Sequence, residues 1–525
     1  MKRPSKKTLK KYALISVFDK EGIASFAKTL QDLGYRIIST SGTAKTLIEN
    51  KIEVTPIQEI TGNPECFDGR MKTISFEVES GILFDRANPL HVKQAKDLLI
   101  KPIDIVVCNL YPFGETIQKE NVKLDTAIEN IDVGGPTMLR AAAKNFKNVL
   151  VIIDPNDYEE IASKLKANLV TDDLRRKLAA KAFAHLSFYD SQIASFLNNE
   201  LFPNETTIPG KKVSDLRYGE NPHQKAAFYL HPITNSPLRN LQKLWGRNLS
   251  LVNLTDINAG LESVRFFDTP SAVVIKHNTP CGMALGKNSF EALSRAIEAD
   301  PESAFGGIIV LNSQMNLKTA RVIGAFKDEN KSNIDIVAVP EIDEAALEYL
   351  KRVRKSMGIY IFGKIPKKRS YDQNIKWIDG GFIVQTADDN TDKIFKEWKV
   401  VTKKKPTKKQ LEQMKITWKF ILRIRSNSVI VVDRTLSMTR GIGSGQTSRF
   451  KSTQIALKQA GKYARDAILA SDSFFPFSDS VKLAAKFGIG AIIQQGGSIN
   501  DKTSIETANK ASIPMVFTHR RAFWH

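Results

Sequence analysis

Cysteines and long apolar stretches are scarce in this chain. Its 525 residues include 3 cysteines, Cys66, Cys108 and Cys281, whose wide spacing makes neither a disulfide framework nor a zinc knuckle. No uncharged apolar run reaches the roughly 18 residues that a membrane-spanning helix needs, so no such helix is expected. The basic start lacks the apolar core and cleavage site of a signal peptide. The sequence therefore predicts a protein of the reducing cytoplasm.

Common nucleotide-binding signatures are also missing. The sequence has no Walker A motif, which argues against an ATP-dependent reaction. The glycine-rich stretch at 441–449 reads Gly-Ile-Gly-Ser-Gly-Gln-Thr-Ser-Arg and lacks the Gly-x-Gly-x-x-Gly spacing of a dinucleotide-binding turn. No acidic residue ends a suitable strand after it, so this stretch does not predict a dinucleotide site.

Acidic residues are outnumbered, with 56 Asp and Glu against 77 Lys and Arg, which gives a net charge of +21. One interpretation is an anionic partner, either a nucleic acid or small phosphorylated and polycarboxylate ligands. The other is a lysine-rich, solvated surface, which the wide spread of the lysines and the lack of interleaved aromatic residues favour. The densest basic stretch, 399–425, is predicted to be helical.

The first part of the chain alternates predicted strands and helices. Four apolar runs predict strands, at 12–17, 35–39, 103–110 and 149–154. They predict an open parallel α/β sheet, whose ligands bind beyond the carboxyl ends of the strands. A helical pattern at 172–199 then leads into 202–210, a polar segment with two prolines that is the predicted domain boundary.

The second part repeats this alternation in two series. The first series has predicted strands at 272–277, 307–312 and 335–340. The second has predicted strands at 428–433, 467–472, 489–495 and 513–518. A Pro- and Lys-rich passage near 363–376 separates them, so two related α/β lobes are expected.

Two basic side chains stand together at the end of one of these strands. Residues 272–282 read Ala-Val-Val-Ile-Lys-His-Asn-Thr-Pro-Cys-Gly, which delivers Lys276 and His277 side by side to a turn. An ammonium beside an imidazole lowers the pKa of the imidazole, and such a pair can remove one proton and supply another. The same half of the chain contains Asp-Pro-Glu-Ser-Ala-Phe-Gly-Gly-Ile at 300–308 and Arg-Ser-Asn-Ser-Val at 425–429, which make the signal of this pair more specific.

Polar residues also follow the strands of the first part. Ser16–Lys20 and Thr40–Thr43 each open a helix after a strand, which suits a phosphate site but also ordinary helix capping. Gly69–Thr73 is a basic loop. Asn109, Tyr111, Asp132, Arg140 and Lys144 lie at strand ends or on the next helix and could orient an amide and move a proton.

Taken together, these motifs resemble the bifunctional AICAR formyltransferase/IMP cyclohydrolase family of purine biosynthesis. The most specific motifs are Lys-His-Asn-Thr-Pro-Cys-Gly, Ser-Ala-Phe-Gly-Gly, Leu-Arg-Tyr-Gly-Glu-Asn-Pro-His-Gln at 216–224 and Ala-Ala-Ala-Lys-Asn at 141–145, and the likeness runs from about residue 12 to 525. It implies a methylglyoxal-synthase-like cyclohydrolase domain at 1–203. It also implies a formyltransferase region at 204–525, built from two cytidine-deaminase-like lobes without zinc. The family's formyltransferase sites lie at a homodimer interface.

The resemblance also implies a role for each motif residue. For formyl transfer, the implied general base is His277, with Lys276 stabilising the oxyanion and Asn427 holding the reactants in register. The residues implied to bind the ribotide are Arg217, Tyr218, Asn253, Phe305, Gly306, Asp335, Arg449, Arg521 and Phe523. For ring closure, the implied catalytic set is Lys72, Tyr111, Asp132 and Lys144. Around the substrate the implied residues are Ser16, Lys20, Thr40, Thr43, Arg70, Thr73 and Asn109.

Several positions depart from the family pattern, mostly in the first part. Phe18 and Ser41 stand where the family usually has a small hydroxyl residue and a glycine. After Lys72-Thr73, the stretch 74–80 reads Ile-Ser-Phe-Glu-Val-Glu-Ser, without the usual two histidines and proline. Leu251 and Val252 replace a usual Tyr-Asn pair.

The resemblance implies AICAR, FAICAR, IMP and 10-formyltetrahydrofolate as ligands, with no metal required for the chemistry and a monovalent cation left open. It favours an enzyme that performs both steps. Because of the altered 74–80 stretch, a formyltransferase with weakened or lost cyclohydrolase activity is the main alternative. A basic nucleic-acid-binding protein is the third hypothesis and rests on charge alone.

Overall fold

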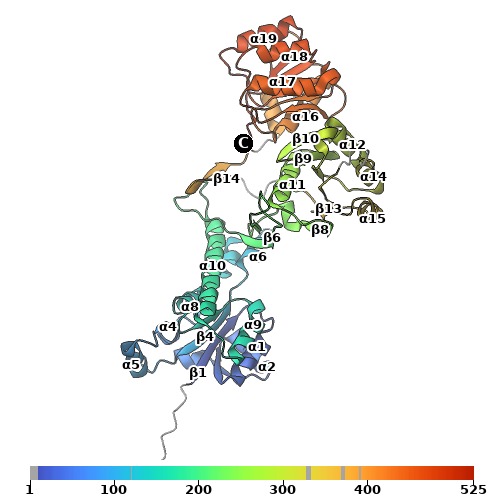
Figure 1. Ribbon diagram of the computed structural model, residues 1–525. Coiled ribbons are helices and arrows are strands. Elements are labelled where there is room, and N and C mark those ends of the chain that lie inside the picture. Colours follow the sequence, from blue (N-terminus) through green and yellow to red (C-terminus); the bar gives the residue numbers. More distant parts are fainter. Residues whose placement is uncertain (1–9, 120, 327–332, 368–372, 389–391) are drawn as a thin grey trace, which may run out of the picture. The chain divides into compact units, whose positions relative to one another are not determined.

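The computed structural model describes residues 10–119, 121–326, 333–367, 373–388 and 392–525 (Figure 1). The chain divides into two compact units. The first comprises Met1–Lys211 and His231–Ile233, and the second comprises Lys212–Leu230 and Thr234–His525. The division falls just after the boundary expected from the sequence at 203.

The first unit contains a five-stranded sheet in the order β3-β2-β1-β4-β5. Its strands are β1 (Lys11–Val17), β2 (Tyr35–Ser39), β3 (Val54–Pro56), β4 (Ile103–Asn109) and β5 (Leu150–Ile152). Every neighbouring pair is parallel, which confirms the predicted sheet. Because the strands run the same way, their carboxyl ends meet at one edge, where the candidate residues of this unit follow them.

Helices flank this sheet in the βαβ manner. They are α1 (Ile23–Asp32), α2 (Ser41–Glu49), α3 (Gln58–Thr61), α4 (Phe76–Leu83), α5 (Pro89–Asp97), α6 (Phe113–Ile117), α7 (Leu124–Glu129), α8 (Gly134–Lys144), α9 (Tyr158–Lys166) and α10 (Asp172–Leu197), with a short 3₁₀ turn at Pro155–Asp157. α10 starts where predicted because the Thr171 hydroxyl accepts the Leu174 N–H as a helix cap.

The second unit contains two six-stranded sheets with the same plan. The first, in the order β10-β9-β11-β12-β13-β8, comprises β8 (Gln242–Trp245), β9 (Ser271–Lys276), β10 (Thr279–Leu285), β11 (Ile308–Leu311), β12 (Ile336–Val339) and β13 (Gly358–Ile361). The second, in the order β18-β17-β19-β20-β21-β16, comprises β16 (Lys399–Val400), β17 (Val429–Val432), β18 (Thr439–Gly443), β19 (Ile468–Ser471), β20 (Ala491–Gln494) and β21 (Met515–Phe517). In the first sheet β11, β12 and β13 are parallel, and in the second β19, β20 and β21 are parallel. In each sheet a two-stranded hairpin pairs antiparallel with one side of this parallel group, and the first strand of the lobe, β8 or β16, pairs antiparallel with the other side. The two lobes are therefore related, as the sequence predicts.

Helices lie in three layers around these sheets (Figure 1). The first lobe has α11 (Leu251–Val264), α12 (Ser289–Ala299), α13 (Pro301–Ala304), α14 (Leu317–Ala325) and α15 (Glu344–Val353), and the second has α16 (Lys408–Ile421), α17 (Arg449–Ala460), α18 (Asp479–Lys486) and α19 (Asp501–Lys510). One hydrophobic cluster runs from α11 through both sheets to α16, so these two helices form a shared inner layer. Separate clusters hold α12, α14 and α15 on one outer face and α17, α18 and α19 on the other.

The basic stretch 399–425 is helical only in part, so that prediction was wrong at its start. Lys399 and Val400 form β16, which pairs with β21. The helix begins after Pro406, where the Thr407 hydroxyl accepts the Gln410 N–H and the Gln410 side chain accepts the Thr407 N–H. Proline is well tolerated just before a helix, and this reciprocal cap fixes the first turn.

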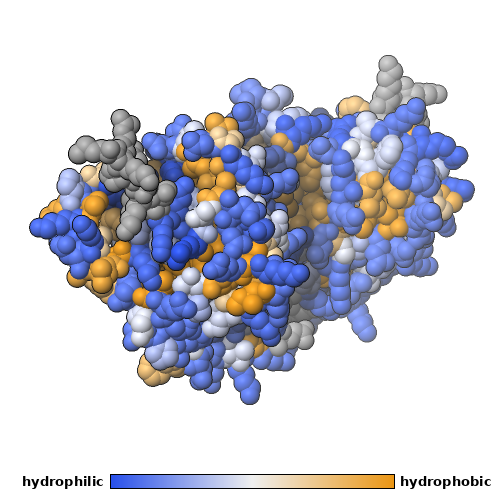
Figure 2. All heavy atoms as spheres, turned by 90° about the horizontal axis from the view of Figure 1, so that it is seen from below, coloured by the Kyte–Doolittle hydropathy of each residue, from blue (hydrophilic) through white to orange (hydrophobic). Residues whose placement is uncertain are grey.

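Small elements complete the second unit. They are the sheet of β6 (Lys211–Asp215) with β7 (Ala227–Leu230), the hairpin of β14 (Gln373–Ile378) with β15 (Gly381–Thr386), and 3₁₀ turns at Pro237–Asn240, Asp392–Glu397 and Gly461–Ala464. The predicted joint at 363–376 lies partly outside the described residues. In the face drawn in Figure 2, hydrophilic residues surround scattered apolar patches. No helix within the described ranges is long and apolar enough to cross a membrane.

A cavity of about 390 Å³ in the first unit encloses a carboxyl group. Its lining comprises Phe76, Glu79, Ser80, Leu83, Phe84, His91, Gln94, Ala95, Leu98 and Ile100. Glu79 Oε1 is buried and has no hydrogen-bond partner among the described residues. Burial raises the pKa of Glu79 to about 7. The folded chain thus keeps a proton that the unfolded chain releases near pH 4.5, so its stability falls as the pH rises between these values.

We expect Glu79→Gln to remove this loss of stability because the amide does not ionise. The melting temperature of the variant should exceed that of the wild type at about pH 8, and the difference should shrink toward about pH 4.5. Glu77→Gln, on the same helix, is the matched control. Parallel curves of melting temperature against pH for the wild type and Glu79→Gln would contradict the assignment.

Candidate active sites

Lys276 and His277 stand at the tip of the β9–β10 hairpin. β9 is buried up to Ile275, its last residue Lys276 is half-buried, and His277, which follows the strand, is exposed. His277 and Asn278 form the two-residue turn and both have positive φ, 53° and 59°. A turn with two positive φ angles matches the twist of a tight hairpin. The hairpin therefore presents the imidazole to solvent at a fixed place.

Asp256 on α11 holds this turn from below, and the sequence motifs did not identify it. Its Oδ1 accepts the Asn278 N–H at 2.6 Å, and the residue is buried. Burial raises the pKa of Asp256, while the backbone N–H of Asn278 and the charge of His277 oppose the rise. The available signal was an acidic residue among the apolar positions Leu254 and Ile257 of a buried helix.

The loop before β11 meets the Lys276 side chain. Lys276 Nζ donates to the Phe305 carbonyl at 2.9 Å. Gly306, with φ +72°, turns the chain there and donates its N–H to the Asn333 carbonyl. Asp335 forms an ion pair with Arg247 at 3.0 Å. Phe305, Gly306 and the Lys276 ammonium are thus brought together, while the Asp335 carboxylate is committed to a neighbouring arginine.

Arg217 and Tyr218 form one unit beside the start of α11. The guanidinium lies 4.6 Å from the centre of the Tyr218 ring, and Nη2 donates to its hydroxyl at 2.9 Å. The Tyr218 carbonyl accepts the Leu251 N–H, which fixes this segment against α11. Asn253 is buried, and its side-chain oxygen accepts the Ser250 N–H in the helix cap. The oxygen of Asn253 therefore has a structural role.

The candidate residues of the second lobe gather around a second buried carboxylate, Asp472. It accepts the Ser428 N–H at 2.9 Å and pairs with Arg449 at 2.8 Å. Asn427 Nδ2 donates to the Gln446 carbonyl at 2.9 Å. The end of the chain packs here as well, since the Ala522 N–H donates to the Asp472 carbonyl.

Phe523 lies between two of the predicted arginines of this lobe. Its ring centre is 4.7 Å from the Arg521 guanidinium and 5.9 Å from that of Arg449. The structure therefore brings Arg449, Arg521 and Phe523 together near Asn427. Asp472, which organises the group, is a further residue that the motif analysis missed.

The two groups lie toward the same end of the junction between the lobes. Ala284 of β10 forms an antiparallel bridge with Met438, just before β18, and the Leu285 N–H donates to the Ser437 carbonyl. Because β10 and β18 run antiparallel, the start of β10, next to Lys276, and the end of β18, near Asn427, extend from this contact in the same direction. Within the described ranges, no hydrogen bond or ion pair joins Lys276 or His277 to Asn427.

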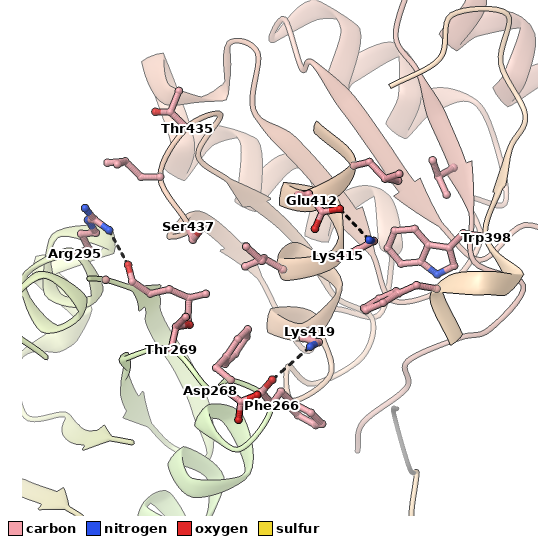
Figure 3. Close-up of a pocket in the computed structure, with 18 of the residues that line it drawn as sticks. Phe266, Asp268, Thr269, Arg295, Trp398, Glu412, Lys415, Lys419, Thr435 and Ser437 are labelled. Atoms are coloured by element: carbon pink, nitrogen blue, oxygen red, sulfur yellow. Dashed lines mark hydrogen bonds and ion pairs between the residues drawn. The ribbon is translucent and has the colours of Figure 1, made fainter. Parts of the chain in front are cut away.

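A cavity of about 1090 Å³ lies at the opposite end of this junction (Figure 3). Leu285 and Ser437 line it, together with Phe266, Trp398 and the basic face of α16. Lys415 pairs with Glu412 at 2.9 Å, and Lys419 donates to the Phe266 carbonyl. This cavity does not contain the Lys276–His277 pair.

In the first unit, Lys72, Tyr111 and Asp132 come together at the carboxyl edge of the sheet. Burial alone would lower the pKa of Lys72, but the Glu65 hydrogen bond and the Tyr111, Glu65 and Asp132 charges raise it. Burial raises the pKa of Asp132, against the opposing N–H groups of Gly135 and Tyr111 and the Lys72 charge. Lys72 Nζ is 3.0 Å from Glu65 Oε1, a partner that the sequence analysis did not name.

Hydroxyl groups line the loops after β1 and β2. Ser16 Oγ and Thr40 Oγ1 are 3.0 Å apart, so a hydrogen bond joins these two hydroxyl groups. Thr43 is buried and bonds the N–H and the carbonyl of Val17, each at 3.0 Å. Asn109 Oδ1 accepts the N–H groups of Phe18 and Asp19. Thr43 and Asn109 therefore shape the loop.

The remaining predicted residues of this unit lie around that group. Phe18 packs edge-on against Tyr111, with ring centres 5.5 Å apart. Arg70 is exposed and pairs with Glu129, and Thr73 is buried. Lys20 Nζ folds back onto the Phe18 carbonyl at 3.1 Å.

Lys144 is the exception, because a single chain does not bring it to Lys72. Asp132 precedes α8 and Lys144 ends it, and a helix of 11 residues is roughly 16 Å long. Lys144 instead lines a cavity of about 540 Å³ with Arg140, Arg176 and Phe183.

Comparison with known proteins decides the family. The AICARFT/IMPCHase bienzyme family matches residues 142–459, and the MGS-like domain matches residues 22–137. The chain belongs to the AICARFT/IMPCHase bienzyme family. Its N-terminal unit thus has the MGS-like fold that the resemblance implied, and the mixed sheets follow it.

Curated members of this bienzyme family match the chain along nearly its whole length. The bifunctional purine biosynthesis protein PurH of Thermoanaerobacter sp. (strain X514) is 46% identical, over 98% of this chain and 100% of that protein. The PurH proteins of Caldicellulosiruptor saccharolyticus and Bacillus mycoides are 45% and 43% identical with the same coverage. A solved structure, the crystal structure of ForH, is 34% identical and covers 35% of this chain and 94% of that chain, with a TM-score of 0.33.

Among the described residues, no group of three or more His, Cys, Asp or Glu could hold a metal ion.

Asp256 offers a test of how the hairpin is held. We expect Asp256→Asn to lower kcat of formyl transfer by about 10- to 100-fold, because a charged acceptor under the turn is lost. KM for the ribotide should change less, since the substrate-facing side chains remain. Glu262→Gln, on the same helix, removes the ion pairs with Arg265 and Arg423, neither of which touches the hairpin. Equal losses of kcat in the two variants would reduce Asp256 to a stability role.

Proposed function

We propose that this bienzyme performs the last two steps of IMP synthesis with one set of residues in each unit. The second unit transfers the formyl group of 10-formyltetrahydrofolate to the 5-amine of AICAR, giving FAICAR. The first unit then closes FAICAR to IMP with loss of water. The Lys276–His277 pair carries the proposal, because the hairpin turn presents a base and an ammonium on adjacent residues, with the ammonium beside the Phe305 loop.

In the transfer step, the AICAR amine attacks the formyl carbon and forms a C–N bond. His277 accepts the amine proton, and Lys276 stabilises the oxyanion of the tetrahedral intermediate. The bond to the folate nitrogen then breaks, and that nitrogen takes up a proton. Asn427 holds the formyl and imidazole groups in register.

The proposed ribotide contacts use the groups described above. Arg217, Arg449 and Arg521 suit the phosphate and carboxamide, while Tyr218, Phe305 and Phe523 suit the flat ring. Gly306 lets the Phe305 loop approach closely. Asn253 and Asp335 complete the proposed set.

We further propose that a homodimer completes the transferase site. Lys276 and His277 belong to one lobe and Asn427 to the other, and no hydrogen bond or ion pair joins them in the described chain. In such a dimer, the Lys276 lobe of one copy would face the Asn427 lobe of the other.

In the closure step, the carboxamide nitrogen of FAICAR attacks the formyl carbon, and the formyl oxygen leaves as water. Lys72 and Tyr111 stabilise and protonate that oxygen, and Asp132 orients the carboxamide and accepts its proton. The reaction is intramolecular, so positioning supplies much of the acceleration. Ser16, Lys20, Thr40, Arg70 and Thr73 are proposed to surround the phosphate, while Lys144 would enter this site only from a second copy.

A transferase with weakened cyclohydrolase activity is the second candidate function. Phe18 packs on Tyr111, and the altered 74–80 stretch forms much of α4 with two added carboxylates. The nucleic-acid hypothesis gains no support from the structure. We place the enzyme in the cytoplasm, with no metal in its chemistry and a monovalent cation left open.

We expect His277→Ala to lower kcat of formyl transfer by about 10²- to 10⁴-fold, since it removes the base. Lys276→Met should also lower kcat of formyl transfer, because the oxyanion loses its stabilising cation. Both variants should close supplied FAICAR at the wild-type rate. The measurement follows tetrahydrofolate release from AICAR and 10-formyltetrahydrofolate, and IMP from FAICAR. No folate turnover by the pure wild-type protein would overturn the assignment.

The raised pKa of Asp132 predicts the pH dependence of ring closure. As the pH falls, Asp132 takes up a proton above its usual range, so kcat/KM for FAICAR should decline at a higher pH than an ordinary aspartate would cause. Asp132→Asn should be slow at every pH and should lack this decline. FAICAR supplied directly also separates the two candidate functions, because closure at the uncatalysed rate favours the weakened cyclohydrolase.

A further inference from the structure

Glu65 occupies the cyclohydrolase site in a way that the mechanism above does not use. Its Oε1 lies 3.0 Å from Lys72 Nζ, and its Oε2 accepts a hydrogen bond from Ser41 Oγ. About a quarter of each charged side chain is exposed, 26% for Glu65 and 28% for Lys72. One carboxylate therefore links the closure residue Lys72 to the first residue of α2.

The start of α2 is a place suited to an anion. Thr40 is its N-cap residue, yet within the described chain its side chain makes no capping hydrogen bond because its hydroxyl meets Ser16. The first turn contains no acidic residue. The N–H groups and the positive end of the helix dipole at such a terminus attract negative charge. The Glu65 carboxylate, held by Ser41, is the anion that lies at this rim.

Gly69 makes room for the Glu65–Lys72 pair. It has φ +87°, and a Cβ there would lie 2.5 Å from Lys72 Cε and 2.9 Å from Glu65 Oε1. No larger side chain fits while the pair stays in place. Burial would raise the pKa of Glu65, but the hydrogen bonds of Ser41 and Lys72 lower it, so the carboxylate stays charged.

We propose that Glu65 is a positioning residue that competes with the substrate phosphate for the start of α2, where the Ser41 hydroxyl holds it, while it keeps Lys72 toward Tyr111 and Asp132. This inference rests on the proposed ring closure. Two anions repel each other in one small site, so the arriving phosphate displaces Oε2 from Ser41. Oε1 keeps its contact with Lys72, which stays charged beside the closing ring. Ser41 stands where the family usually has glycine, so this chain has an additional hydrogen bond that holds the Glu65 carboxylate at the start of α2.

Removing the Ser41 hydroxyl tests the competition. We expect Ser41→Ala to lower KM for FAICAR by about 3- to 10-fold with kcat unchanged, because Glu65 loses one hydrogen bond. Inorganic phosphate should inhibit closure at correspondingly lower concentration, and calorimetry should find tighter IMP binding. A higher KM would make Ser41 a plain phosphate ligand, and an unchanged KM would mean no competition. Either result overturns the proposal.

Glu65→Gln tests the hold on Lys72. It should lower kcat, and the basic limb of the pH profile should move to lower pH, because Lys72 loses the charge that raises its pKa. Glu59→Gln, an exposed acid just upstream, is the matched control. A lower kcat with an unmoved basic limb would reduce Glu65 to a structural role. If the wild type neither binds IMP nor closes FAICAR, the proposed function fails; if it does both and Ser41→Ala behaves like the wild type, this inference alone fails.

Discussion

The apolar layer formed by α11 and α16 is the constraint on which the second unit depends. Both six-stranded sheets bury one face against it, and the alternate strand residues pack against outer helices. Two sheets that share one layer bring their hairpin edges together, so Ala284 of β10 meets Met438, just before β18. That contact closes one end of the junction, and Lys276 and Asn427 belong to the other. The placement of the reactive side chains thus follows from the packing of side chains that take no part in the chemistry.

In the first unit the corresponding constraint is parallel pairing. Five strands with one direction bring their carboxyl ends to one edge, where Ser16 lies near the end of β1 and the following connections carry Thr40, Tyr111 and Asp132. Much of this could be predicted, because a strand buried on both faces is a continuous apolar run, as Ala13, Leu14 and Ile15 are. The predicted strand at 35–39 has the observed bounds. The edge strand β10 was not predicted, because Thr-Pro-Cys-Gly at its start is a poor strand pattern.

The residues that the sequence did not identify share one property. Asp256, Asp472 and Glu65 act on partners distant in the chain, and local patterns contain no information on such pairs. Lys144 illustrates the same limit from the opposite side. Helical spacing assigns a face to Lys144, but it cannot say which end of α8 reaches Lys72, and the structure puts about 16 Å of helix between them. Motifs predict which side chains matter, whereas long-range contacts decide which of them meet.

The three carboxylates also act by the same physics, with different outcomes. Asp472 is fully buried and pairs with Arg449, the Ser428 N–H and the Ser426 hydroxyl, so its charge is balanced in a fixed arrangement. Asp256 is buried beside a turn and offers its charge to N–H groups at the tip, which suits a hairpin that must not move. Glu65 is partly exposed, and water can replace its Ser41 partner at low cost. Burial therefore separates carboxylates that fix a site from one that an arriving anion can displace.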